Sequence, residues 1–361
     1  MGCDGTAVNT GTTGGVCRLF ELVTGSPVHW FICQLHGNEL NLRSLVTTLG
    51  GTASGPRSFT GPIGRFCAGD VWEADVVAYE PVPGNTPDLP AAVIQELSTD
   101  QQLLYLLAAA VQSGSVDNKT AGRRIGPLNH ARWLTLAARL LRLYVSTVAP
   151  SGALQDLVQY VVRHYVPMWF TIHQNSSCDQ GSRNLFRSVV LLRDLPQRSQ
   201  AVIRPVIQRN GYWAHSEQLL LAMVTDSERA VREKAVQHIG AARQLHAEEV
   251  RPFVIPVVNF DATTYTDLIS WDGRITQPPL LRDLSHSELV HVMDAPLTVP
   301  PYPVHTQAVE RAVRMVTEAC TAVIGDEARD GHITHHCKAE TSTPASCAQF
   351  QAGYAATEAE L

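Results

Sequence analysis

The chain has 361 residues, enough for two or three domains, and its composition, 45% hydrophobic and 17% charged, is that of a globular protein. We find neither an apolar run long enough to cross a bilayer nor a secretory leader, and eight scattered cysteines favour reduced thiols in an intracellular protein over a disulfide framework. The formal charge of −6 excludes a global basic field, so any contact with nucleic acid depends on local basic faces.

Polar, chemistry-bearing side chains follow two short apolar stretches near the N-terminus. Asp4 stands at what we interpret as a strand end, and the apolar run at 28–33 predicts a buried strand that leads into Cys33-x-x-His36. Residues 16–23 between them have helical spacing. This link is short enough for a right-handed crossover, so we expect two parallel strands of one small sheet, with the acid and the Cys-His pair at one edge.

A second apolar-periodic segment, at 40–49, predicts a helix directly after this pair. Glycine and proline pairs then punctuate a long irregular stretch at 50–96, in which 76–79 favours a short strand. The Gly- and Pro-rich loop at 55–64 lacks the Lys-Ser/Thr ending and the following helix of a P-loop. That difference favours an ordered connector over a phosphate site.

Helices dominate the middle of the chain. Ser98, Thr99 and Asp100 are suitable N-caps for the first of them, and Pro167 is expected to end the third. Trp169 and Trp213, with Trp271 further on, are interpreted as core or interface residues. The expected helices cover residues 103–111, 129–144, 154–165, 182–192, 199–207, 216–223 and 227–245.

The C-terminal part is mixed. Residues 253–258 are strand-like, 305–323 have the spacing of a helix, and the chain from 337 onward is polar enough to predict disorder. The expected organisation is a partial sheet segment at 1–49, an irregular connector at 50–96, a mainly helical insertion at 97–303, a C-terminal helix at 304–336 and a tail at 337–361.

Each polar candidate has two interpretations. Asp4 is either an acid of a catalytic site or an acid that caps a loop. Cys33 and His36 are either two of four zinc ligands or a buried thiol and a hydrogen-bonded imidazole; the second is favoured because no clear second ligand pair is present. Glu310, followed by Arg311, belongs either to the same site as Asp4 or to an exposed pair on a helix.

The predicted helix at 129–144 is strongly amphipathic and basic. Arg132, Arg139 and Arg142 fall on or near one of its faces. Such a face either binds phosphates or is simply the solvated side of the helix. Trp133 beside Arg132 is either a core side chain or a ring on which a base stacks.

Four sequence islands, in this order, resemble the catalytic domain of hAT-type DNA transposases: Asp4-Gly-Thr-Ala-Val-Asn9, Cys33-x-x-His36-x-x-x-Leu40, Arg132-Trp133, and Thr306-Gln-Ala-Val-Glu310-Arg311. The resemblance spans most of the chain. It implies an RNase H-like sheet interrupted by a large helical insertion. We therefore expect an α/β remnant of that fold with a large, mainly α-helical insertion, mostly α overall.

The same resemblance assigns roles to these residues. It implies that Asp4 and Glu310 are catalytic acids and metal ligands, that Cys33 and His36 form a supporting motif, and that Arg132 and Trp133 contact DNA. Arg139 and Arg142 extend the expected DNA-binding face. Transposases of this kind use two Mg²⁺ ions held by three acids.

The family's first acid lies on a strand that would precede Met1, so we expect further strands upstream of this residue. The resemblance therefore implies a truncated, transposon-derived nuclear protein that is catalytically incomplete and retains DNA binding and self-association. Mg²⁺ is expected only if some activity remains. One alternative is a helical protein-interaction module without a nucleic-acid role. Another is a Mg²⁺-dependent transposase or nuclease that is completed by an N-terminal segment.

Overall fold

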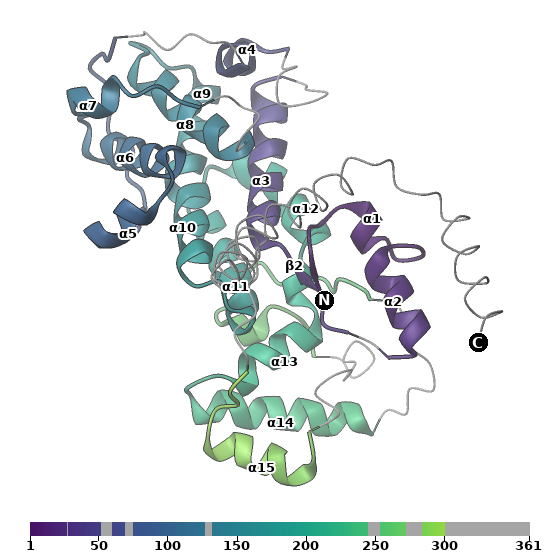
Figure 1. Ribbon diagram of the computed structural model, residues 1–361. Helices are drawn as coiled ribbons and strands as arrows, with labels where there is room; N and C mark the ends of the chain where they lie inside the picture. The colour runs from purple at the N-terminus through teal and green to yellow at the C-terminus, as the bar shows by residue number, and fades with distance from the viewer. Residues whose placement is uncertain are drawn as a thin grey trace, which may run out of the picture. The chain divides into compact units, whose positions relative to one another are not determined.

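The computed structural model describes residues 1–26, 28–51, 60–68, 75–126, 132–244, 253–271 and 284–299 (Figure 1). All of them belong to one compact unit, Met1–Thr306. The helix expected at 305–323, with Glu310, and the tail expected from 337 lie outside the described residues. The domain boundaries expected within 1–303 remain predictions.

Two short parallel strands form the sheet at the N-terminus. Strand β1 is Gly2–Cys3 and β2 is Phe31–Ile32, with Gly2 opposite Phe31 and Cys3 opposite Ile32. Helices α1, Ala7–Thr10, and α2, Val16–Thr24, lie between them in the chain. The predicted parallel pairing is therefore confirmed, although the second strand is shorter than 28–33. The strands predicted at 76–79 and 253–258 are wrong, because neither segment forms a strand.

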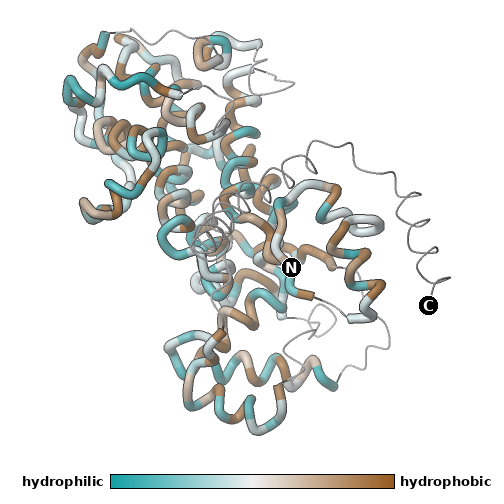
Figure 2. Tube along the Cα trace, viewed as in Figure 1, coloured by the Kyte–Doolittle hydropathy of each residue, from teal (hydrophilic) through white to brown (hydrophobic). Residues whose placement is uncertain are grey.

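Helix α2 packs with its polar side inward. Arg18 and Glu21 are buried, whereas Leu19, Phe20 and Val23 of its apolar stripe are exposed. Oε1 of Glu21 accepts hydrogen bonds from the indole Nε1 of Trp30, at 3.0 Å, and from a backbone N–H of the next segment. Figure 2 shows the hydrophobic residues along this helix in brown. The stripe that predicted the helix thus forms part of the described surface.

Helix α3, Gln34–Leu49, connects the sheet to the helical body. It starts directly after β2 and packs against α8, α9, α10 and α12. Leu42, Leu45 and Val46 on its inner side are buried in the largest apolar cluster of the protein. The N-terminal segment is therefore built into the same core as the helices that follow it, and β1 and β2 are fixed relative to them.

The predicted helices of the middle region are present, with small shifts at their ends. The helical elements are α4 Pro62–Ala68, α5 Ala91–Glu96, α6 Thr99–Ser113, α7 Asn118–Ala121, α8 Arg132–Val145, α9 Gly152–Tyr160, η1 Val161–Tyr165, α10 Val166–Gln174, η2 Cys178–Gln180, α11 Gly181–Arg193, α12 Gln197–Arg209, η3 Tyr212–Ala214, α13 Ser216–Val224, α14 Arg229–Arg243, η4 Tyr265–Asp267 and α15 His286–Asp294. Two of them, α4 and α5, fall in the stretch expected to be irregular.

Local signals explain where several of these helices begin. Ser98 and Gln101 form a reciprocal capping box at the start of α6. Pro167 does not end its helix, which corrects the prediction. The chain passes from α9 to α10 through the π-helical turn η1, in which the N–H of Val166 donates to the carbonyl of Val161. This wider turn places the proline in the first turn of α10, where its missing N–H is tolerated.

Smaller apolar clusters supplement the main core. One joins α13, α14 and α15, and another lies under the sheet around Trp30, Ile32 and Phe253. Trp169 and Trp213 are buried, as predicted, and Trp271 packs at the edge of the core. Within the described part of the chain, no helix has the length and apolar character needed to span a membrane.

Candidate nucleic-acid interface

Asp4 lies in the turn between β1 and α1. Its Oδ1 accepts hydrogen bonds from the backbone N–H of Thr6 (3.2 Å), the hydroxyl of Thr6 (2.7 Å) and Nδ2 of Asn9 (2.7 Å). Partial burial raises the pKa of the carboxyl, but the hydrogen bonds from Thr6 and Asn9 and the nearby His36 outweigh burial, so the net pKa is lowered. The interpretation of Asp4 as a loop-capping acid therefore has direct structural support, and the group is ionised at neutral pH.

The two strand ends meet, as the sequence predicts. The half-buried His36 ring lies over Gly5, so closely that a methyl group on Gly5 would come within 3.3 Å of Cδ2 of His36. Cys33 is buried at the N-terminus of α3, and Nδ1 of His36 is 4.0 Å from Oε2 of Glu39. Asp4 and the Cys33–His36 pair therefore belong to one site at the carboxyl ends of β1 and β2.

The described residues do not fit a pair of Mg²⁺ ions. Two divalent ions need a cluster of carboxylates, and Asp4 already uses Oδ1 to order its own turn. Across the described segments, no three His, Cys, Asp or Glu side chains come together in a way that could hold a metal. Glu310 lies outside those segments, so its predicted partnership with Asp4 remains a prediction.

The basic helix α8 differs from the predicted phosphate-binding face. Arg139 and Arg142 are only 4% and 5% exposed. Nη1 of Arg139 donates to the carbonyl of Cys67 at 2.6 Å, and the Arg142 guanidinium donates to the carbonyls of Ala121 and Thr120. The expectation that the two arginines lie on a surface face, solvated or DNA-binding, is therefore wrong: each bridges α8 to the chain segments packed over it.

Arg132 and Trp133 mark the start of α8. Trp133 is half-buried and packs against the main core. The side chain of Arg132 is not among the described groups, so its predicted contact with DNA remains untested. The core interpretation of Trp133 thus has structural support, and its predicted role in base stacking remains a prediction.

An exposed basic hollow of ≈ 390 Å³, which the sequence did not single out, lies between α3 and α12. Arg43 and Arg209 flank it, and the hydroxyl-bearing residues Ser44 and Thr47 line its α3 side. Within the described segments, neither guanidinium makes an ion pair or hydrogen bond. The only feature of the sequence that points to this hollow is the position of Arg43 on the polar side of an amphipathic segment. The two guanidinium groups provide donors for an anion such as phosphate, whereas the Thr47 hydroxyl already donates to backbone carbonyls of α3.

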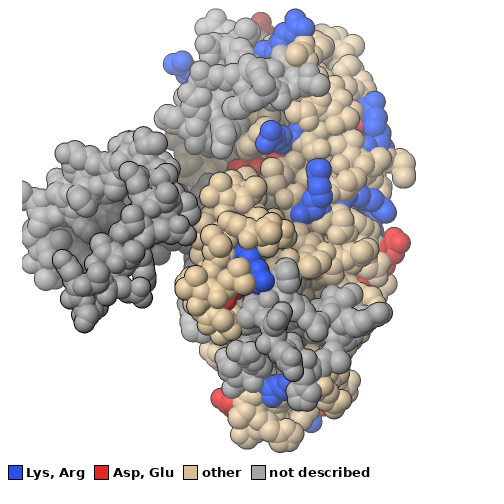
Figure 3. All heavy atoms as spheres, turned by 90° about the vertical axis from the view of Figure 1, so that its right-hand side faces the viewer, with Lys and Arg blue, Asp and Glu red and all other residues tan. Residues whose placement is uncertain are grey.

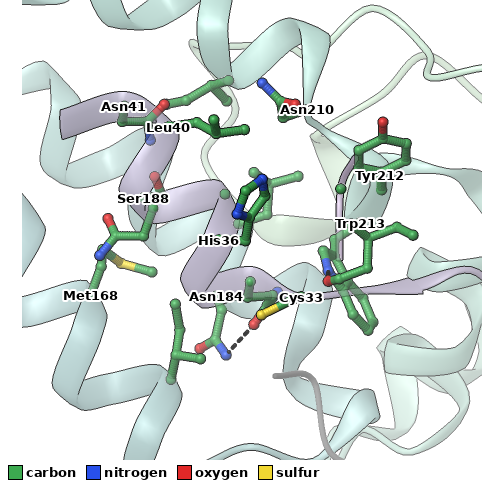
Figure 4. Close-up of a pocket in the computed structure, with 18 residues that line it drawn as sticks. Cys33, His36, Leu40, Asn41, Met168, Asn184, Ser188, Asn210, Tyr212 and Trp213 are labelled. Carbon is green, nitrogen blue, oxygen red and sulfur yellow. Dashed lines mark hydrogen bonds between the residues drawn. The ribbon is translucent and has the colours of Figure 1, made fainter. Parts of the chain in front are cut away.

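A smaller cavity of ≈ 60 Å³ adjoins this hollow, and the two share Leu40 and Asn210 in their walls. Figure 4 shows the His36 ring in the middle of the cavity, with Leu40 and Asn210 toward one end and Cys33 and Asn184 toward the other. The cavity therefore links the strand-end site to the basic hollow.

The wall of this cavity is held by long-range contacts. Nε1 of Trp213 donates to the carbonyl of Ile32 at 2.8 Å, and the hydroxyl of Tyr212 donates to Oγ1 of Thr10 at 3.1 Å. Trp213 also lies directly on Gly181, where a Cβ atom would overlap the indole ring. The turn that carries Tyr212 and Trp213 is thus tied both to the sheet and to α11.

Comparison of the chain with known protein families, curated proteins and solved structures finds no match. Its function is therefore inferred from its own residues and their geometry.

Proposed function

We propose that this chain is a transposase-derived, hAT-type protein that binds DNA and is catalytically incomplete. The observation that carries the proposal is the meeting of Asp4 with the Cys33–His36 pair at the carboxyl ends of two parallel strands. The RNase H-like interpretation requires this arrangement, since it places acid and Cys-His motif at one sheet edge. A long helical region after the sheet is also what that interpretation expects.

The basic hollow supports DNA as the partner. Arg43 and Arg209 line the hollow, which shares Leu40 and Asn210 with the cavity that contains His36. Figure 3 shows Lys and Arg side chains spread over the described part of one face of the protein, with fewer Asp and Glu side chains among them. Binding that depends on a few arginine–phosphate contacts is weak and falls steeply with salt.

Two acids are too few for efficient phosphoryl transfer by a two-metal mechanism. The resemblance assigns acid roles to Asp4 and Glu310 only, and Asp4 is engaged in its own turn. Two carboxylates alone hold a second Mg²⁺ poorly. We therefore expect DNA binding without appreciable strand cleavage.

A gel-shift titration of the full chain with duplex DNA at two salt concentrations tests the proposal. We expect binding at low salt that weakens as salt rises, and a loss of about tenfold in affinity for Arg43→Gln or Arg209→Gln, because a hydrogen bond to a charged group contributes about 1.5–3 kcal/mol. Lys119→Gln, an exposed charge on α7, is the control and should bind like the unmodified chain. Salt-independent binding, or robust Mg²⁺-dependent cleavage, would contradict the proposal.

The exposed apolar stripe of α2 favours a second candidate, a protein-interaction module. Phe20 and Val23 are 49% and 86% exposed, and large apolar side chains gathered on one helix face often contact a partner protein. No DNA binding at any salt concentration, combined with self-association or partner binding that is lost in Val23→Ser, would favour this candidate over the first.

A further inference from the structure

Two cysteine thiols from different elements meet beside the sheet. Cys3 is the last residue of β1 and Cys17 lies in the first turn of α2, and their Sγ atoms are 3.6 Å apart. Either thiol can donate the hydrogen bond between them. The sulfurs of a disulfide are about 2.0 Å apart, so closing one here needs an approach of about 1.6 Å, which small rotations of the two side chains can supply.

Contacts on both sides hold the two sulfurs in place. The carbonyl of Cys3 accepts a hydrogen bond of 2.8 Å from the N–H of Cys33, at the end of the parallel ladder. Cys17 is 0% exposed and belongs to the apolar cluster around Trp30, against which Cys3 also packs. The hydrogen bond from Trp30 to Glu21 fastens α2 to the same cluster. The meeting of the two thiols is therefore a fixed feature of the folded chain.

Exposure distinguishes Cys3 from the other cysteines of the described segments. Cys3 is half-buried, whereas Cys17, Cys33, Cys67 and Cys178 are all buried. An oxidant in solution therefore reaches Cys3 first, and Cys17 lies behind it as a second thiol. An accessible cysteine next to such a resolving cysteine is the arrangement that redox-responsive proteins often use.

We propose that Cys3 and Cys17 form a redox site that reacts with hydrogen peroxide and closes into a reversible disulfide between β1 and α2. Sγ of Cys3 attacks one oxygen of the peroxide and breaks the O–O bond. The released hydroxide takes up the Cys3 thiol proton, so a sulfenic acid and water form. Sγ of Cys17 then attacks the sulfenic sulfur and displaces its hydroxyl, which leaves with the Cys17 proton as a second water. The two thiols lose two electrons, and the peroxide gains them.

The new bond joins the strand end that carries Asp4 to helix α2. It closes a loop of about 15 residues, and closing such a loop stabilises a protein by restricting its unfolded chain. We therefore expect the oxidised chain to have a melting temperature several degrees above that of the reduced chain. The inference goes beyond the proposed DNA binding and does not depend on it.

Peptide mapping of the full chain by mass spectrometry tests the proposal, because the tryptic peptide 1–18 contains both thiols and no other cysteine. The folded chain is treated with hydrogen peroxide, and its remaining thiols are then alkylated in urea. We expect peptide 1–18 to be two hydrogens lighter and unlabelled in most molecules. The peptides that contain Cys33, Cys67 and Cys178 should be labelled and serve as internal controls. Dithiothreitol should restore labelling of peptide 1–18.

Two variants separate the roles of the thiols. Cys17→Ser should stop the reaction at the sulfenic acid of Cys3, which dimedone traps. Cys3→Ser should leave Cys17 unmodified, because its thiol is buried, and should abolish the rise in melting temperature. Thermal unfolding shows whether each variant is folded. If Cys17→Ser unfolds, Cys3→Ser and the mapping of the unmodified chain still decide the question.

Two labelled thiols in peptide 1–18, at a peroxide dose that oxidises glutathione in the same solution, would overturn the proposal. So would a disulfide that joins this peptide to the one that contains Cys178, or an oxidised chain that melts at or below the temperature of the reduced one. DNA binding is measured separately in the presence of dithiothreitol, so failure of the redox site and failure of the proposed function are distinguishable.

Discussion

Oε1 of Glu21 accepts a hydrogen bond of 3.0 Å from Nε1 of Trp30, and through it α2 is fastened to the residue that precedes β2. Both side chains are buried, at 2% and 1% exposure. This contact explains why α2 presents its polar side to the protein: the buried carboxylate also meets Arg18 at 3.4 Å and the N–H of Val28 at 3.2 Å. The crossover between the strands is thus held by a polar network.

Glu21→Ala should destabilise the protein, because it leaves the Trp30 indole and the Val28 N–H without an acceptor. We expect a loss of roughly 1.5–3 kcal/mol in the free energy of unfolding, measured by urea denaturation. Val23→Ser on the exposed side of the same helix is the matched control and should change stability by no more than about 0.5 kcal/mol. A larger loss in Val23→Ser than in Glu21→Ala would show that α2 packs by its apolar side.

Arg142→Met should lower stability. Its guanidinium donates to the carbonyls of Ala121, Thr120 and Arg123, and the substitution leaves these acceptors without their charged donor. We expect a loss of about 2 kcal/mol or more in urea denaturation, since hydrogen bonds to a charged group contribute about 1.5–3 kcal/mol. Any loss of DNA affinity in this variant should follow the loss of folded protein. Weaker DNA binding by a fully folded Arg142→Met would instead restore this residue to the DNA-binding surface.

Acidification should destabilise the protein through its buried histidines. Burial, together with the nearby N-terminal charge, lowers the pKa of His29 to about 4, and burial lowers that of His215 to about 3. An unfolded histidine has a pKa of about 6.5, so between pH 6.5 and 4 the unfolded chain binds more protons than the folded one. Stability contributed by the neutral rings is therefore full above pH 6.5 and falls as the pH falls toward 4.

His29→Phe provides the measurement for this pH effect, because a phenyl ring preserves the stacking on Phe31 and cannot titrate. The loss of stability between pH 6.5 and 4.5, measured by urea denaturation, should be smaller in the variant, by about 1.4 kcal/mol for each unit of pKa shift removed. An unchanged pH dependence would mean that His29 titrates normally and is not buried as described.

Glu217→Gln should stabilise the protein at neutral pH. Glu217 is 1% exposed, neither of its carboxyl oxygens has a hydrogen-bond partner among the described residues, and burial raises its pKa. A raised folded pKa means that the stability associated with the protonated form is full below the unfolded pKa of about 4.3 and is lost as the pH rises. The melting temperature of the variant should therefore exceed that of the unmodified chain at pH 8, and the two should converge toward pH 4. A lower melting temperature at pH 8 would reveal a partner for the charged carboxylate.

The sequence by itself determined the local elements and one long-range pairing. Helical spacing and N-cap residues such as Ser98 located the helices, because these signals act within one or two turns of the chain. The short link between β1 and β2 allowed little other than a parallel crossover, so the meeting of Asp4 with Cys33 and His36 was predictable.

Tertiary structure decided which side of each helix faces the core and where the cavities lie. The spacing of Arg139 and Arg142 is typical of a surface face of a helix. Both side chains are nevertheless buried, because they donate hydrogen bonds to backbone carbonyls of other segments of the chain. The apolar stripe of α2 is exposed because the polar side of this helix packs inward, where Glu21 accepts a hydrogen bond from Trp30. The hollow and cavity around Leu40 and Asn210 arise where α3 meets α12, more than 150 residues later. Which side of a helix is buried and where a cavity forms depend on residues distant in sequence, so the local periodicity of the sequence does not predict them.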